Sequence, residues 1–259
     1  MDQLQLVAFP LPAEAELHFA ESPAVRLVLP KSDTSRGFVP YHKLELTPST
    51  PGDYLVLAAV EAWESPGNAS VGLRMAFGTE RWPVESSEGS REYFGNSLVY
   101  HQSYLWARVV RVESSGGTLE IEVDPSVGGG SRLQHARILA VRTDCFDAVH
   151  QRTAHEEITV PATGPVELEL QLEAAPRPYG VVSLQAVTVT GTAVSKARFE
   201  GAMTFTTDHP GFSHEMRAPA GLVDLVSDGA AHSFGNRVLP PPGGGELFAK
   251  ESFILLLER

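Results

Sequence analysis

Short apolar segments with a period of two residues decide what this chain can fold into. Apolar and polar residues alternate from Leu119 to Asp124, and the same alternation runs from Val166 to Glu173. Alternate residues lie on opposite faces of a β-strand, so each of these segments has one dry face and one wet face. The 23 Gly and 19 Pro that punctuate the chain would interrupt any long helix. The sequence therefore predicts an all-β fold.

The alternating and β-branched runs define a series of strands separated by turns. In the first half of the sequence, strands are predicted at Leu4–Phe9, Ala13–Phe19, Val25–Leu29, Lys43–Thr47, Tyr54–Trp63, Val71–Phe77, Leu105–Val112, Thr118–Val123 and Arg137–Arg142. In the second half, they are predicted at Glu157–Val160, Val166–Glu173, Val181–Val189, Ala197–Thr206, Ser213–Arg217, Gly221–Leu225, Ala231–Phe234 and Glu251–Glu258. Gly-, Pro-, Ser- or Asn-rich turns fall between many of them.

The two halves resemble each other in the order and character of their strands. A strand from Tyr54 to Val60 corresponds to one from Val181 to Val187, at an offset of 127 residues (181 minus 54). The apolar closing strands of the two halves correspond at an offset of 116 (254 minus 138). A tandem duplication with unequal loops explains both offsets, and chance similarity among β-strands is the alternative. Because the closing strands have few polar residues, we expect them to be central strands covered on both faces.

These patterns predict two tandem β-sandwich domains that resemble jelly rolls. The first domain is expected to span residues 1–148, including an N-terminal extension, and the second to span residues 165–259. Residues 149–164 are expected to be a linker, because the segment around His150 to Glu157 is polar and leads into a Pro- and Gly-containing turn.

Composition argues against several classes of partner. The formal net charge is −12, and Lys and Arg do not cluster into a stripe that could follow a phosphate backbone, so nucleic acid and anionic membrane are not expected partners. The first residues are acidic rather than basic and do not resemble a signal peptide. No run approaches the roughly 18 apolar residues of a membrane helix. We therefore expect the protein to stay where it is made, or to leave in an assembly or by lysis.

The residues that most often carry catalysis or bind metals are not arranged in recognisable motifs. His150 and His155 are five residues apart, as are His209 and His214, so neither pair has the short spacing of zinc ligands. Cys145 follows an apolar strand and is expected to be a buried structural thiol. We expect a protein that is not an enzyme and carries no metal or cofactor.

Two weaker alternatives concern a calcium site and a phosphate-binding loop. Asp144 and Asp147, with Asp124 nearby, have the ligand type that calcium prefers, but they do not form an Asp-rich loop. The glycine triplets at 128–130 and 243–245 lead into strands rather than helices, so we interpret them as loops and not as phosphate sites.

Aromatic residues gather in one region of the first half and are the candidate ligand-binding residues. The segment from Arg91 to Trp106 holds three Tyr, one Phe and one Trp, and a further Trp lies just upstream. Exposed aromatic rings stack on sugars or fill pockets of a partner protein. The alternative is that these rings close the open end of the sandwich. The candidates are Trp82, Tyr93, Tyr100, Tyr104 and Trp106.

The segment from His135 to Asp147, with a fainter echo at Phe253–Arg259, resembles a motif of uncharacterised structural proteins of tailed bacteriophages and related particles. The resemblance implies a non-enzymatic head-decoration, fibre or tail-associated protein, located in the virion and assembled in the bacterial cytoplasm. It implies other virion proteins as partners and assigns no functional residue.

Two further function classes remain open from the sequence. The first is a carbohydrate-binding β-sandwich module that binds a surface glycan through the aromatic candidates. The second, an enzyme such as a polysaccharide-degrading jelly roll, lacks a convergent catalytic set. Because so many strands must leave free sheet edges, we also expect a homo-oligomer or an assembly-bound state.

Overall fold

The computed structural model describes the backbone of residues 11–22, 27–28, 37–63, 70–82, 92–93, 101–124, 132–154, 158–160, 166–172, 179–192, 197–200, 205–207, 213–217, 220–225, 232–239 and 246–258. Side chains are described at 11–22, 37–61, 73–82, 106–124, 133–151 and 257. Within these residues the protein is all-β, with twenty strands and one short 3-10 helix, η1 (Thr143–Cys145). The described part of the chain contains no helix that is long and apolar enough to cross a membrane.

The first ten strands form two antiparallel sheets. The first inner sheet has the order β1 (Leu17–Glu21), β10 (Arg132–Arg142), β4 (Gly52–Trp63) and β8 (His101–Val112), with β2 (Leu27–Val28) also paired to β10. The first outer sheet has the order β3 (Val39–Leu46), β9 (Gly117–Asp124), β5 (Ser70–Phe77) and β6 (Glu80–Trp82), with β7 (Glu92–Tyr93) also paired to β5.

The last ten strands form two further sheets. The second inner sheet has the order β11 (Ala148–Ala154), β20 (Glu246–Glu258), β14 (Tyr179–Thr192) and β17 (Ser213–Arg217). Two short strands also pair within it, β12 (Ile158–Val160) with β20 and β18 (Ala220–Leu225) with β14. The second outer sheet has the order β13 (Val166–Leu172), β19 (His232–Leu239), β15 (Ala197–Glu200) and β16 (Phe205–Thr207).

The strand order of the first half is repeated in the second. Each sheet of the second half has the order of its counterpart with the strand numbers raised by ten, with one exception. β7 pairs with β5 of the first outer sheet, whereas β17 pairs with β14 of the second inner sheet, next to β18. The register repeats as well, because Tyr54 pairs with Arg142 between β4 and β10, and Val181 pairs with Glu258 between β14 and β20. These two pairs are related by the sequence offsets of 127 and 116. The repeat in the sequence is therefore a repeat of topology and register.

A β-bulge lies in the closing strand of each half. In β10, His135 and Ala136 lie between Gln134, which pairs with Glu61, and Arg137, which pairs with Ala59. In β20, Lys250 is the extra residue between two consecutive pairs with β14. A bulge adds one residue to one strand and increases its twist. Because a bulge occurs in the same strand pair of both halves, the halves resemble each other in this local irregularity as well.

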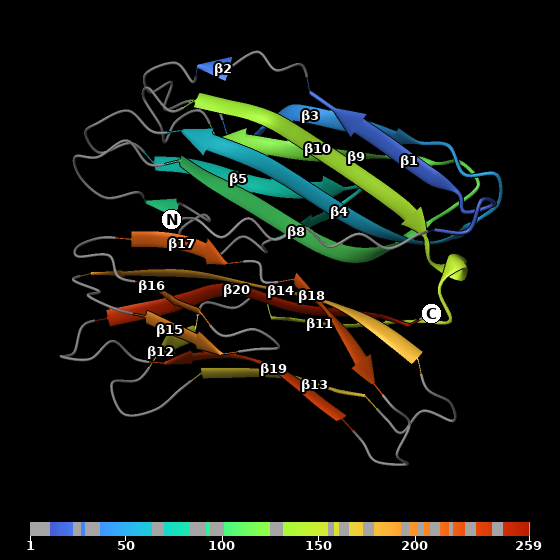
Figure 1. Cartoon of the computed structure of the whole chain (residues 1–259). Coiled ribbons are helices and arrows are strands. Elements are labelled where there is room, and N and C mark those ends of the chain that lie inside the picture. Colours follow the sequence, from blue (N-terminus) through green and yellow to red (C-terminus); the bar gives the residue numbers. More distant parts are fainter. Residues whose placement is uncertain are drawn as a thin grey trace.

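The four sheets are stacked in layers, with the two inner sheets in the middle (Figure 1). Between the first outer and first inner sheets lies the main core, which includes Leu46, Tyr54, Met75 and Ile138. A second cluster joins the other face of the first inner sheet to the second half, and in it Leu55 and Val141 pack with Leu257 of β20. The first inner sheet thus buries apolar residues on both of its faces, against the first outer sheet and against the second half.

The closing strand β10 is covered on both faces, as the sequence predicted. Ile138 and Ala140 are fully buried in the main core, whereas Val141 belongs to the cluster between the halves. This arrangement explains the scarcity of polar residues in β10, because neither face of its centre meets water.

Several segments differ from the sequence expectations. Most of β11 lies in the expected linker, residues 149–164, and it pairs with β20, whereas β12 in the same segment corresponds to the strand expected at Glu157–Val160. Among the described strands β11 ends the strand order of its sheet, a position compatible with a polar sequence. Ala13 and Glu14 form a turn, so β1 begins only at Leu17. The strand expected at Ala197–Thr206 is divided into β15 and β16, β6 and β7 are additional strands, and the strand expected at Leu4–Phe9 lies outside the described residues.

Candidate functional site

Two of the five aromatic candidates are core residues. The side chains of Trp82 and Trp106 are only 1% and 2% exposed, and both belong to the main core. The guanidinium of Arg108 lies over the Trp82 ring, with its Cζ 5.2 Å from the ring centroid. Neither indole presents an open face on which a sugar could stack. At these two positions the aromatic side chains pack inside the protein and do not form a surface for a ligand.

For the three tyrosine candidates the structure describes the backbone of two and not their side chains. Tyr93 lies in β7 and its backbone pairs with Ser70 of β5. Tyr104 lies in β8 and pairs with Val60 of β4. Tyr100 lies outside the described residues. The structure brings Tyr104 and Trp106 onto one strand, but sugar binding by the tyrosines stays a prediction.

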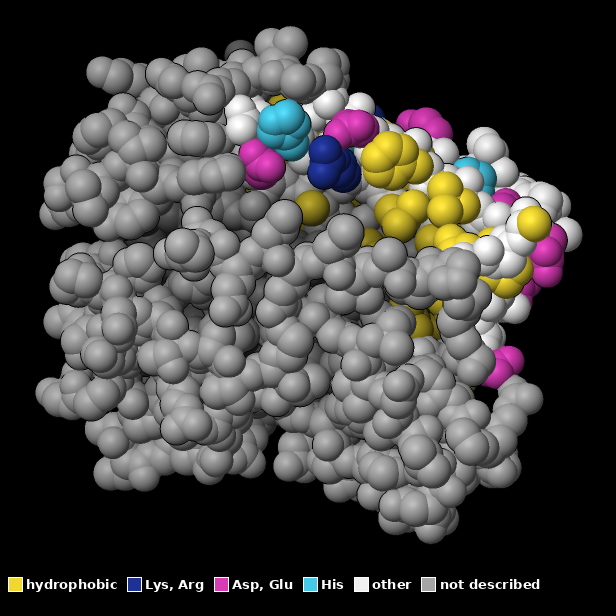
Figure 2. Space-filling view, in the orientation of Figure 1, with side chains coloured by type: hydrophobic (Ala, Val, Ile, Leu, Met, Phe, Trp, Pro, Cys, Tyr) yellow, Lys and Arg dark blue, Asp and Glu magenta, His cyan; other side chains and the backbone are white. Residues whose placement is uncertain are grey.

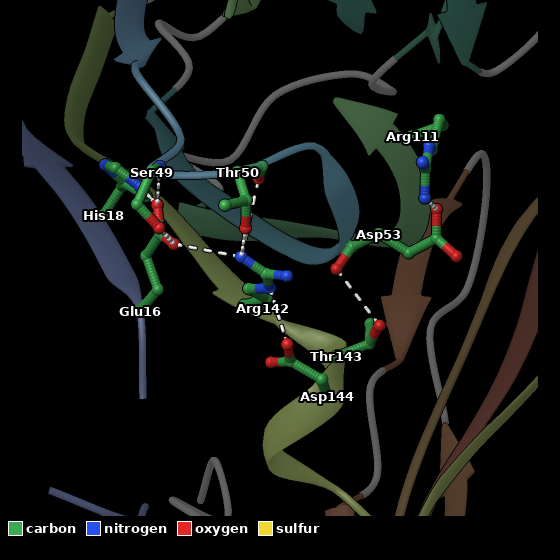
Figure 3. Close-up of polar contacts among 9 residues, drawn as sticks. All are labelled: Glu16, His18, Ser49, Thr50, Asp53, Arg111, Arg142, Thr143 and Asp144. Carbon is green, nitrogen blue, oxygen red and sulfur yellow. Dashed lines mark hydrogen bonds and ion pairs between the residues drawn. The ribbon is translucent and has the colours of Figure 1, made fainter. Parts of the chain in front are cut away.

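A set of polar contacts that was not expected from the sequence surrounds Glu16 and Arg142 (Figure 3). The Glu16 carboxylate accepts hydrogen bonds from the Ser49 amide at 3.0 Å and from the Ser49 hydroxyl at 2.7 Å. Nε2 of His18 lies 3.2 Å from the same carboxylate. Glu16 thus ties the start of β1 to the turn between β3 and β4. We call the set Glu16, His18, Ser49, Thr50, Arg142 and Asp144 the Glu16–Arg142 cluster.

Arg142 completes this cluster from the end of β10. Its guanidinium lies 3.4 Å from Glu16, forms an ion pair of 2.7 Å with Asp144, and donates a hydrogen bond to the Thr50 hydroxyl. It packs so closely on Gly52 that a Cβ there would lie 3.2 Å from Nε of Arg142. The cluster stands where the chain leaves the first half through η1, so it fixes the junction between the halves.

The environment of the cluster shifts two pKa values in opposite directions. Burial alone would raise the pKa of Glu16, but the two hydrogen bonds from Ser49, together with the neighbouring Tyr54 and His18, prevail and lower it to about 2. Burial, and secondly the neighbouring Glu16 carboxylate, raise the pKa of Tyr54 to about 12. Both shifts favour a charged Glu16 beside a neutral Tyr54. A carboxylate held this firmly in its charged form is suited to structure rather than to proton transfer near neutral pH.

A second ion pair lies on the first outer sheet. Arg74 of β5 bonds to Glu122 of β9, whose side chain is almost buried, and Arg81 approaches the same carboxylate at 3.4 Å. The guanidinium of Arg74 lies 4.0 Å from the ring centroid of Phe38. The Glu122 carboxylate would be costly to bury alone. Its ion pair with Arg74 offsets that cost and links β9 to β5.

The metal and nucleophile candidates whose side chains the structure describes do not form a common centre. Among the side chains that the structure describes, no group of three or more His, Cys, Asp and Glu is placed to hold a metal ion. Asp144 is engaged by Arg142. Cys145 is half-buried beside the cluster that joins the halves. Of the paired histidines, His155 and His209 lie outside the described residues, and His214 lies in β17.

An exposed apolar pair was also missed by the sequence analysis. Leu17 and Phe19 of β1 are 47% and 53% exposed and lie on the same face of the strand. Figure 2 shows hydrophobic side chains gathered on the surface of the first half, where Figure 1 places β1 and β10. The alternation around His18 indicated a strand, but it could not show that the apolar face would be left uncovered.

Comparisons with known proteins identify no family. No family model matches the chain, and no curated protein matches it. Among solved structures, dimeric latent PorU from Porphyromonas gingivalis is 9% identical with a TM-score of 0.32, and the match covers 88% of this chain and 25% of that one. The chain therefore spans a quarter of the length of PorU.

Two further solved structures are similar to most of the chain. The CBM22-1–CBM22-2 tandem of Xyn10C from Paenibacillus barcinonensis is 9% identical with a TM-score of 0.24, covering 96% of this chain and 93% of that one. The VP2 subviral particle of infectious bursal disease virus is 10% identical with a TM-score of 0.30, covering 98% of this chain and 75% of that one. Scores this low assign no function, which must be inferred from the packing of this chain.

Proposed function

We propose that this chain is a non-enzymatic structural protein that acts through protein–protein packing. One observation carries the proposal: the repeated module stacks on itself through equivalent faces. Val141 of β10 and Leu257 of β20 occupy corresponding positions, 116 residues apart, and both lie in the apolar cluster between the inner sheets. The inner sheet of this module is therefore a surface that packs against its own kind.

Two sets of polar contacts in the first half serve the same purpose. The Glu16–Arg142 cluster joins β1, the turn before β4 and η1, and Arg74 and Glu122 join two strands of the outer sheet. Networks of this type fix the position of elements, because each buried charge has a partner. They favour a rigid building block over a site that must bind and release a substrate.

At a finer level, we propose a component of a virion or phage-like particle, assembled in the bacterial cytoplasm with other virion proteins as partners. The support is the sequence resemblance of His135–Asp147 to structural proteins of tailed bacteriophages. In the fold this segment covers the end of β10, its bulge and η1, where the first half passes into the second. A stacked all-β block would suit repeated packing on a particle.

The proposal is tested by fractionating particles from the source culture on a density gradient and quantifying this chain by mass spectrometry. We expect it in the particle band, at a constant ratio to the major particle protein after high-salt washing. Recovery only in the soluble fraction would contradict the virion role.

A glycan array with the purified chain tests the competing carbohydrate-binding function. Reproducible sugar binding that is lost on Tyr93→Ala or Tyr104→Ala, with unchanged folding, would overturn the packing proposal. Trp82→Ala is unsuited to this purpose, because removing a buried indole would damage the core.

A further inference from the structure

We propose that β1 is a self-association edge, at which two copies of the chain pair their β1 strands in antiparallel fashion about a two-fold axis at His18. The first inner sheet would then continue across the dimer. This inference goes beyond the proposed function and does not depend on it, because the edge would join two copies whether or not they belong to a particle.

Among the strands that the structure describes, β1 ends the strand order of its sheet, and none of them pairs with its outer side. On the β10 side, the Glu16 carbonyl accepts a hydrogen bond from the Arg142 amide at 3.0 Å, and the Ser22 amide donates to the Ala136 carbonyl at 2.8 Å. In an antiparallel ladder these groups alternate between the two sides of a strand. The N–H and C=O groups of Leu17, Phe19 and Glu21 therefore point away from β10.

The side chains of the same residues form an uncovered apolar surface. Leu17 pairs with Val141, and Phe19 pairs with Leu139, so both lie on the face of the inner sheet that the second half covers. Leu257 is fully buried on that face, whereas Leu17 and Phe19 remain 47% and 53% exposed. The surface at β1 is thus the open continuation of an interface that is already formed within the chain.

The corresponding edge strand of the second half, β11, has different residues at the positions of Leu17 and Phe19. Val149 and Gln151 of β11 pair with Leu257 and Leu255, so they correspond to Leu17 and Phe19 of β1. Val149 packs into the cluster between the halves, and the Gln151 side chain accepts a hydrogen bond from the Val109 amide at 3.0 Å. The second half therefore has an amide in place of the exposed phenyl ring.

A second copy is the occupant that fits this edge. A two-fold axis at His18 would place Leu17 of one copy opposite Phe19 of the other, twice, on the same face of the extended sheet. The strand has no Pro or Lys, which are common guards of exposed edges. The surface that covers the rest of this face is a repeat of the same module, so a self-complementary partner continues an established mode of packing.

The charge of the chain predicts how association should depend on salt. A net charge of −12 makes two copies repel one another, and salt screens that repulsion. Because the contact itself is apolar and backbone-mediated, the dimer should become stronger as the salt concentration rises. An interface built on surface ion pairs would weaken instead.

The test is sedimentation velocity of the full chain over a range of concentrations at low and high salt. We expect a monomer–dimer equilibrium that Phe19→Lys weakens at least about tenfold, because the new charge would be desolvated at the edge. Val39→Lys is the matched control, because Val39 is an exposed apolar residue on β3, in the other sheet. Circular dichroism and thermal melting of each variant establish that it is folded.

A monomer at every concentration would overturn the proposal, and so would equal weakening by the two folded variants. The pairing geometry has its own test, in which a photo-crosslinking amino acid replaces Leu17. Crosslinks to residues 17–21 of a second copy support the antiparallel pairing. Crosslinks confined to another region of a second copy would overturn it.

Discussion

Glu16 shows how a single side chain can connect parts of the chain that are far apart in the sequence. It lies 126 residues from Arg142, yet the two approach to 3.4 Å, and Ser49 contributes both its amide and its hydroxyl to the same carboxylate. The ion pair is only partly exposed, with 20% and 21% of the two side chains accessible, so solvent screens it less than a surface pair. Its effect on stability should therefore be measurable.

Acid should destabilise the protein through Glu16. Folding lowers the pKa of this group from 4.5 to about 2, so its contribution is complete above pH 4.5 and is lost as the pH falls toward 2. Glu16→Gln should lower the free energy of unfolding by roughly 2–3 kcal/mol at pH 7. Urea unfolding between pH 2 and 7 measures both effects. Glu14→Gln is the control, because Glu14 is exposed two residues upstream, and an equal loss in both variants would contradict the prediction.

Alkali should destabilise the protein through Tyr54. Its pKa is raised from 10.0 to about 12, so its contribution is complete below pH 10 and is lost as the pH rises from 10 toward 12. Ultraviolet titration of the native protein should show late-ionising tyrosine, to which Tyr54 contributes beside Tyr41, whose pKa is also raised by burial. Tyr54→Phe should reduce the late component by the absorbance of one tyrosine, and an unchanged late component would contradict the prediction.

Two glycines with positive φ should respond differently to alanine. A Cβ at Gly116, where φ is +74°, would lie 2.2 Å from the Leu46 carbonyl oxygen, whereas a Cβ at Gly78, where φ is +58°, would meet open space. Gly78→Ala should cost about 1 kcal/mol for the backbone alone, and Gly116→Ala should cost clearly more because the hairpin between β8 and β9 must shift. Thermal unfolding of the two variants measures the difference, and equal losses would show that the hairpin yields easily.

At the level of elements, the bulge of β10 depends on a residue outside the strand. The Ala136 amide, displaced from the ladder, donates a hydrogen bond of 2.9 Å to the hydroxyl of Ser22, and His135 next to it has a positive φ of 51°. Ala136 is fully buried, so its amide would otherwise be left unpaired away from water. The end of β1 therefore stabilises an irregularity in its neighbour.

Ser22→Ala should destabilise the protein by about 1–3 kcal/mol, because it leaves the buried Ala136 amide without its acceptor. Ser115→Ala, in the exposed turn between β8 and β9, is the matched control and should be nearly neutral. Urea unfolding measures both variants. Hydrogen exchange of the Ala136 amide should also accelerate in Ser22→Ala, and unchanged protection there would show that another group accepts its hydrogen bond.

The sequence predicted most strands, because alternation is a local property of the chain. It aligned β4 with β14 and β10 with β20 correctly, since apolar runs and Pro-rich turns recur in the same order. It could not show that Trp82 and Trp106 would be buried, because an aromatic residue suits a core and a binding surface equally well. The Glu16–Arg142 cluster and the exposed apolar face of β1 depend on which distant segments come into contact. A local sequence pattern cannot predict those contacts.

At the level of the whole molecule, an apolar cluster joins the two halves. Leu257, from the closing strand of the second half, is fully buried against Leu55 and Val141 of the first half. Independent folding of the halves, as two separate domains, stays a prediction. The apolar cluster between the inner sheets indicates that each half stabilises the other.

Leu257→Ala should lower the free energy of unfolding by about 2–5 kcal/mol, because it leaves a cavity in this cluster. Removal of Phe253–Arg259 should be more severe, since it takes away a large part of β20, the central partner of β11 and β14. Calorimetry of the point variant and solubility of the truncated chain measure the two effects. Soluble, cooperatively folding protein after truncation would contradict the predicted dependence.

The central position of the closing strands has a consequence for synthesis on the ribosome. β10 inserts between β1 and β4, so residues 17–21 have no partner until residues 137–141 have been made. The second half repeats this order, because β11 must wait for β20. Such long-range closure is slow and leaves strand edges unpaired in the nascent chain. A ribosome that stalls before residue 132 would therefore expose an incomplete sheet, whose unpaired edges are prone to pair with other nascent chains.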